Sequence, residues 1–244
     1  MLFAPGARPG RDALRALADG VGGFSITFDP AAESGASADA GEAGEAWLEL
    51  LASGLTFDLT GLSPGPAAAL PPARHAFGLA GDLAEQNLEA ITLRPGPHLA
   101  GGEAMVPVIR CLAWLAARLA TLPGAQAVAW HPARCWSAPQ PFRAGVQRWV
   151  EGGPFPGLSL AALAQGPDGA LQSEGLALFV GQELRIEPEL AENPAAGAKL
   201  ALRLAHWLVE SGPLTDPQPL AGPEGERLRL EPSANRRFVR VWKG

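Results

Sequence analysis

Apolar residues recur in this chain with two different periods, and this alternation constrains the fold more than any other feature. Between Phe24 and Phe28, apolar and polar side chains alternate, which is the period of a β-strand with one face in water. Between Asn193 and Gly212, apolar residues return every three or four positions, which is the period of an amphipathic helix. The sequence therefore predicts a fold that combines strands and helices.

The helix that begins after Asn193 has the clearest ends. Asn193 is a favoured capping residue, Pro194 suits the first turn, and Gly212 with the following proline ends the helix. The charged residues of this helix fall on one stripe, where His206 is expected to be exposed to solvent.

The other elements follow from the same two periods. Further helices are predicted over Arg11–Asp19, Trp47–Ala52 and Pro107–Leu119, and from a cap at Ser137 to Val150. Strands are predicted over Gly23–Asp29, Leu55–Leu62, Leu88–Arg94, Ala125–Trp130, Leu158–Ala164, Leu171–Val180, Glu183–Glu187, Arg227–Leu230 and Phe238–Trp242. A two-residue turn at Gly181 is expected to join two of them as a hairpin. Residues 30–46 show no apolar period and are expected to form a loop.

Strands and helices alternate early in the chain and give way to hairpins later. This order favours an α+β fold in which helices pack on a mixed, largely antiparallel sheet, with two similar α/β lobes as the alternative. The proline-rich span Ser63–Arg74 is the best boundary. We therefore expect an N-terminal α/β lobe over residues 1–75, packed on an α+β domain over residues 76–244.

Charge and composition exclude several classes of partner. The net charge of −6 and the acidic pI repel a polyanion, so no nucleic-acid partner is expected. No secretory signal and no apolar run long enough to cross a bilayer is visible, so we expect no membrane partner and a cytoplasmic location. The two cysteines fit a reducing compartment. Arginine far outnumbers lysine, and alanine, glycine and proline abound, which is typical of a GC-rich bacterial genome.

The segment Gly61–Gly65 matches the G-x-S-x-G pattern of serine hydrolases directly after a predicted strand. In that motif, the residue after the serine donates its backbone N–H to the oxyanion. Here that residue is Pro64, which has no N–H. The segment is therefore interpreted as a proline-rich turn.

The loop from Trp130 to Trp136 holds the densest group of chemically versatile side chains. Three functions are open for it: His131 and Cys135 as metal ligands, Cys135 as a thiolate activated by His131 or Arg134, or an aromatic binding wall. A metal site needs further ligands, and no other residue lies at a recognised spacing, so neither a metal nor another cofactor is expected. Binding through Trp130, His131, Arg134 and Trp136 is the leading interpretation.

Two carboxylates, Glu183 and Glu187, flank Arg185 on a predicted strand. Paired carboxylates are typical of glycosidases, but the intervening arginine favours a salt-bridged, solvated face. Cys111 lies among apolar residues of a predicted helix and is expected in the core.

Basic and aromatic residues gather at the end of the chain. With the strand period, Phe238, Arg240 and Trp242 share one face, which could stack bases or bind an acidic partner. A closing edge strand protected by its charges is the simpler interpretation.

Two segments resemble a bacterial family known as domain of unknown function 4261. They are Ala127–Pro132, and Glu174–Leu184 leading into the helix that ends at Trp207–Gly212. The resemblance covers roughly the second half of the chain, from about Leu88. It implies an α+β fold and a bacterial cytosolic protein, and it supplies no activity and no catalytic residues.

These patterns predict a non-catalytic module that binds a protein or a small molecule. The alternative is a cysteine-dependent hydrolase or transferase in which Cys135 is the nucleophile and His131 the base.

Overall fold

The computed structural model describes residues 1–30, 47–79, 87–223 and 225–244. They form two compact units, Met1–Ala129 with Trp136–Glu151, and Trp130–Cys135 with Gly152–Gly244. The predicted boundary after residue 75 falls inside the first unit. Nearly all of the predicted loop at residues 30–46 lies outside the described residues.

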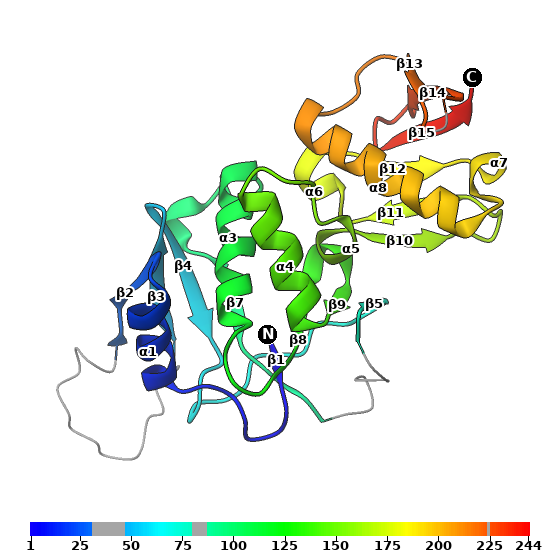
Figure 1. The fold of residues 1–244 in the computed structure, drawn as a ribbon. Coiled ribbons are helices and arrows are strands. Elements are labelled where there is room, and N and C mark those ends of the chain that lie inside the picture. Colours follow the sequence, from blue (N-terminus) through cyan, green and yellow to red (C-terminus); the bar gives the residue numbers. More distant parts are fainter. Residues whose placement is uncertain (31–46, 80–86, 224) are drawn as a thin grey trace. The chain divides into compact units, whose positions relative to one another are not determined.

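A four-stranded antiparallel sheet lies in the first unit (Figure 1). Its order is β2 (Phe24–Phe28), β3 (Leu48–Ala52), β4 (Leu55–Thr60) and β7 (Thr92–Pro95). Helix α1 (Arg11–Val21) packs on β2, and α3 (Val106–Leu119) packs on β4 and β7. Alternate side chains of β3 and β4 are fully buried, which is the strand period that burial on one face requires: Leu48, Leu50, Phe57 and Leu59.

A second, five-stranded sheet lies largely in the first unit. Its order is β5 (His75–Phe77), β9 (Cys135–Ser137), β8 (Ala125–Trp130), β1 (Leu2–Phe3) and β6 (Glu89–Ala90). Helix α4 (Pro139–Val150) packs on α3, and the short helix η2 (Pro97–Leu99) follows β7. Cys111 on α3 is buried, and its Sγ lies 3.4 Å from the Ala52 carbonyl oxygen, so its predicted place in the core is confirmed.

The second unit is built on a six-stranded sheet. Its order is β10 (Ala162–Gln165), β11 (Leu171–Glu174), β12 (Glu183–Ile186), β15 (Phe238–Lys243), β14 (Arg227–Pro232) and β13 (Gln218–Ala221). The β12–β15 pair is parallel, and the other pairs are antiparallel. Helix α8 (Pro194–Ser211) packs on β11 and β12 (Figure 1). Shorter helices are η3 (His131–Ala133), α5 (Gly157–Leu160), α6 (Ala177–Val180) and α7 (Pro188–Ala191).

Helices that pack on mixed, largely antiparallel sheets confirm the predicted α+β class. The ends of α8 are also confirmed. The Asn193 side chain accepts hydrogen bonds from the backbone N–H groups of Ala195 and Ala196 at 3.0 and 3.2 Å, and Gly212 follows with a φ of 85°. Within the described residues, no helix is both long and apolar enough to cross a membrane.

Several predicted elements are wrong. The predicted helix Trp47–Ala52 is strand β3, because its alternate residues are buried and its backbone pairs with two strands. The predicted strand Leu88–Arg94 divides at Ile91 into β6 and β7, which belong to different sheets. The start of the predicted strand Leu158–Ala164 is helix α5.

The predicted hairpin around Gly181 is also wrong. The chain leaves β11 after Glu174 and forms helix α6 before β12 begins. Ser137 lies fully buried in β9 rather than capping α4. Strand β15 is not at an edge, because β12 and β14 pair with it on its two sides.

Candidate functional site

Most side chains in the predicted binding loop are buried. Trp130 is 5% exposed, Cys135 is 1% exposed, and Ala133 is fully buried, whereas His131 lies at the surface. Helix η3 forms the middle of this loop in the second unit. Burial of these groups favours packing over contact with a ligand.

The Trp136 side chain belongs to the first unit. It is 8% exposed and packs in a buried apolar cluster with Leu2, Leu88, Ala90 and Ala127. It therefore contributes to the core around the five-stranded sheet.

Arg134 ends η3 in the left-handed backbone region, with φ 46° and ψ 39°. Its guanidinium forms an ion pair with the Glu174 carboxylate at the end of β11. Gly175 has a φ of 94°, and a Cβ there would come within 2.8 Å of the Ala133 Cα, so only glycine lets the two segments pack this closely. The ion pair and this close approach hold the loop against β11.

The alternative enzyme needs an accessible thiolate at Cys135. Its Sγ is instead buried and lies 3.6 Å from the Leu158 carbonyl oxygen, a distance that fits a weak thiol donor. The His131 side chain is exposed. This geometry favours a packing role for Cys135 and presents no exposed sulfur to a substrate.

The Gly61–Gly65 segment is tied to the N-terminal segment of the chain. The Ser63 N–H donates to the Pro9 carbonyl at 3.0 Å. Arg8 donates to the carbonyl oxygens of Gly61 and Gly65 at 2.5 and 3.0 Å. These contacts favour a structural role for the segment, as its proline content predicts.

The expected ion pair between Arg185 and Glu187 is present, but the expected solvent exposure of Glu187 is wrong. Glu187 is 3% exposed and accepts hydrogen bonds from Arg185 at 3.2 Å and Arg240 at 2.6 Å. The Glu183 carboxylate accepts bonds from three successive backbone N–H groups, at residues 175–177, at the start of α6. Both carboxylates are therefore engaged in holding the second unit together.

The charged stripe of α8 is expected to leave His206 exposed to solvent. His206 is half-buried, and its Nδ1 accepts a hydrogen bond from the Phe155 N–H at 3.3 Å, so its predicted solvent exposure is only partial.

No group of three or more His, Cys, Asp or Glu residues in the described part of the chain could hold a metal ion.

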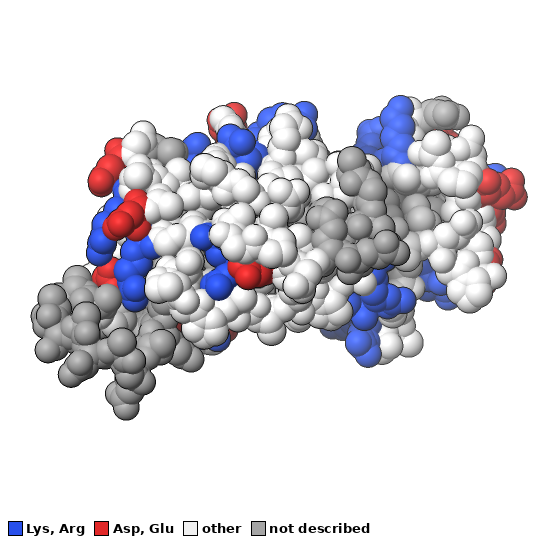
Figure 2. All heavy atoms as spheres, turned by 90° about the horizontal axis from the view of Figure 1, so that it is seen from below, with Lys and Arg blue, Asp and Glu red and all other residues white. Residues whose placement is uncertain are grey.

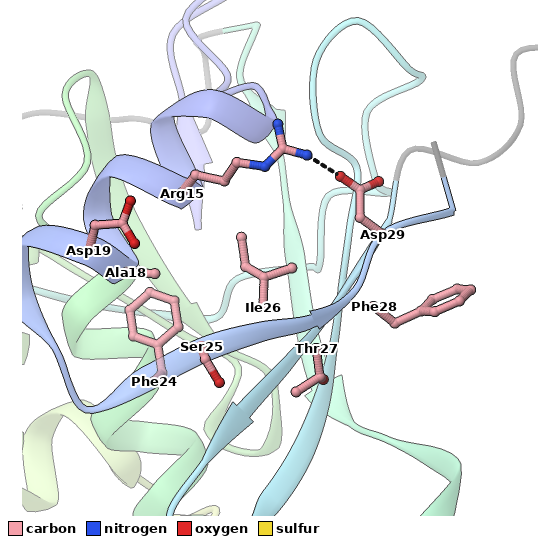
Figure 3. A pocket seen from close by; sticks show the side chains of 9 residues that line it. All are labelled: Arg15, Ala18, Asp19, Phe24, Ser25, Ile26, Thr27, Phe28 and Asp29. Atoms are coloured by element: carbon pink, nitrogen blue, oxygen red, sulfur yellow. Dashed lines mark hydrogen bonds and ion pairs between the residues drawn. The ribbon is translucent and has the colours of Figure 1, made fainter. Parts of the chain in front are cut away.

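Among the described residues, a groove in the first unit, which the sequence did not reveal, is a candidate site (Figure 3). It has a volume of about 520 Å³. One wall is strand β2 and the residue after it, Phe24–Asp29, and the other wall consists of Arg15, Ala18 and Asp19 from α1.

The groove lies beside β2, which is an edge strand of its sheet within the described residues. This strand is the first in its sheet and pairs with β3 on one side, and no described segment pairs with it on the other. Six consecutive residues line the groove, so both faces of the strand border it. Phe24 and Ile26 point toward α1, whereas Ser25 and Thr27 are exposed on the opposite side (Figure 3).

An ion cluster around the buried Asp29 carboxylate lies at one end of this groove. The Asp29 carboxylate is 7% exposed and accepts hydrogen bonds from Arg11 Nε at 3.0 Å and from Arg15 Nη2 at 2.7 Å. Arg15 also pairs with Asp12 at 3.1 Å. These contacts tie α1 to the residue that follows β2.

The charged surface of the molecule is patchy. On the face in Figure 2, Lys and Arg atoms form small groups among uncharged residues. The predicted absence of a nucleic-acid partner stays a prediction.

The fold and the groove define the chain as an α+β protein with an open surface site. Neither protein-family models, nor curated proteins, nor solved structures give a significant match to it. The resemblance to domain of unknown function 4261 therefore stays a prediction.

Proposed function

We propose that this chain is a non-catalytic binding module that takes an extended segment of a partner protein along the free edge of β2. The observation that carries the proposal is the groove, because all five residues of the edge strand β2 line it, together with Asp29 that follows the strand. An edge strand presents backbone N–H and C=O groups that an added strand can pair with.

The walls of the groove fit an added peptide strand. In strand addition, main-chain hydrogen bonds supply affinity, and pockets for alternate side chains supply specificity. Phe24 and Ile26 provide an apolar floor toward α1, and the small side chain of Ala18 leaves space between helix and strand. A volume of about 520 Å³ lies within the range of small ligand sites and holds a few side chains.

The cysteine-dependent enzyme has less support. Its nucleophile would be the Cys135 sulfur. Cys135 is 1% exposed, and its Sγ lies 3.6 Å from the Leu158 carbonyl oxygen. The groove, in contrast, is open, and the ion cluster at Asp29 lies at one end of it.

Selection of peptides from a phage-displayed library of random dodecapeptides on the full chain tests this proposal. We expect binders with alternating apolar residues that shift the backbone amide resonances of residues 24–29. Ala18→Arg fills the groove and weakens their affinity at least tenfold. Ala16→Arg, at an exposed position of the same helix that does not line the groove, is the matched control and leaves affinity unchanged.

Failure to select any peptide would refute strand addition. Binders whose shifts fall outside β2 and α1, or that bind the two arginine variants equally, would also refute it.

A further inference from the structure

The six-stranded sheet of the second unit has two unlike faces, and this surface is independent of the groove beside β2. The inner face of β14 and β15 is buried: Leu228, Leu230, Val239 and Val241 are at most 1% exposed. The alternate residues point the other way, and the side chains of Arg229 and Arg240 are 62% and 40% exposed.

The pairing register places aromatic and basic side chains together on this outer face. Arg229 is opposite Trp242, and Glu231 is opposite Arg240. The Arg240 guanidinium lies 4.3 Å from the centre of the Trp242 ring, and its Nε donates to Glu187 at 2.6 Å. Arg240 is thereby held over the indole ring.

Some cations at this face are neutralised by neighbours. Arg229 forms an ion pair with Glu231, and the Glu187 carboxylate forms ion pairs with both Arg185 and Arg240. These pairs order the centre of the face and leave it with little net charge.

Three exposed arginines at the two ends of the β14–β15 hairpin have no ion pair with any described carboxylate. Arg227 begins β14, and Arg236 and Arg237 lie in the turn that leads into β15. Six strand residues span roughly 15 to 20 Å at the rise of a β-strand. Arginines thus lie at both ends of the hairpin, and Trp242 lies between them, nearer to Arg227.

We propose that this outer face of β14 and β15, which we name the arginine face, binds an acidic segment of a partner protein. Carboxylates of the segment pair with Arg227 at one end and with Arg236 and Arg237 at the other. An apolar side chain between them packs on Trp242. Tryptophan and arginine are the residue types that most often dominate binding energy at protein interfaces.

The overall charge favours a short acidic peptide over a nucleic acid. The chain carries a net charge of −6, which repels an extended polyanion. A short segment responds mainly to charges within the Debye length, about 8 Å at physiological ionic strength. At that range, attraction of a carboxylate falls mainly to the exposed arginines that have no ion pair with a described carboxylate, because Glu231 and Glu187 already pair with Arg229 and Arg240.

Fluorescence anisotropy with three labelled probes tests the arginine face. The probes are a dodecapeptide of alternating Glu and Leu, the same peptide with Lys in place of Glu, and a single-stranded DNA dodecamer. We expect saturable binding of the acidic peptide alone, weakened by added salt. The triple variant R227Q/R236Q/R237Q loses at least tenfold in affinity. The matched control K199Q/R203Q, which removes exposed cations from α8, does not.

Circular dichroism establishes that both variants fold. The absence of saturable binding by the acidic peptide would overturn the proposal, as would equal loss in both variants, which indicates general charge attraction. Tighter binding of the DNA dodecamer that depends on the same three arginines would overturn it in favour of a nucleic-acid surface.

Discussion

Arg8 Nε lies 2.8 Å from Glu89 Oε2, so an ion pair joins the N-terminal segment to strand β6 across 81 positions of sequence. The Arg8 side chain is 11% exposed, and its two other nitrogens bond the carbonyl oxygens of Gly61 and Gly65. One guanidinium therefore connects three segments of the first unit.

Replacement of this guanidinium destabilises the first unit. Arg8→Met leaves the carbonyl oxygens of Gly61 and Gly65 without their donor, and we expect the free energy of unfolding to fall by about 2 kcal/mol. Urea denaturation measures this change. Arg94→Met, at an exposed position of β7, is the control and should shift the midpoint little. An equal effect of the two substitutions would show that the Arg8 contacts add nothing.

Acid should weaken the same connection. The hydrogen bond from Arg8 lowers the pKa of Glu89 below its usual value of 4.5 in the folded protein. The unfolded chain then binds more protons than the folded chain, so this contribution to stability is complete above about pH 4.5 and is lost as the pH falls through the lowered pKa. Denaturation midpoints at pH 3 to 6 check it. Glu89→Gln removes this part of the acid dependence, and an unchanged profile would contradict the prediction.

Glu183 is expected to be essential to the fold of the second unit. Its carboxylate accepts bonds from the Ser173 hydroxyl at 2.5 Å and from the N–H groups of Gly175 and Ala177 at 2.9 and 3.1 Å. An amide has only one accepting oxygen, so Glu183→Gln should lower the free energy of unfolding by about 2 kcal/mol. Calorimetry measures the effect against Glu210→Gln, an exposed position on α8. If the two variants melt alike, the carboxylate does not hold α6.

Both thiols should react slowly with iodoacetamide at neutral pH. Burial raises the pKa of Cys111, and Cys135 is 1% exposed, so neither presents a reactive thiolate. Mass spectrometry of timed samples should show labelling at least tenfold slower than in urea. Rapid labelling of Cys135 in the folded chain would contradict this prediction and support the alternative function, an enzyme in which His131 is the base.

Local patterns predicted the elements whose signals are complete within one segment. Asn193, Pro194 and Gly212 define both ends of α8 without help from the rest of the chain. The segment Trp47–Ala52 has no such signals, and only its pairing with β2 and β4 makes it a strand. Likewise, α6 interrupts a run of apolar residues because a carboxylate eight positions beyond Gly175 binds the N–H groups at its start.

The candidate sites also divide into features that a local pattern predicts and features that depend on long-range contacts. The sequence predicted that Phe238, Arg240 and Trp242 share a face, because alternation along one strand is a local property. It did not reveal that β2 is an edge strand or that α1 lies beside it, and the groove depends on both. It also singled out Cys135 and Trp130 by residue type, whereas burial depends on contacts with distant segments.

By itself, the sequence determined the α+β class, the long capped helix and the two-faced terminal strands, since each depends on neighbours a few positions apart. Only the tertiary structure decided, for the described part of the chain, which strands lie at a sheet edge, which carboxylates form ion pairs and which arginines form none. Those outcomes depend on contacts between residues far apart in the chain, and neither periodicity nor composition contains them.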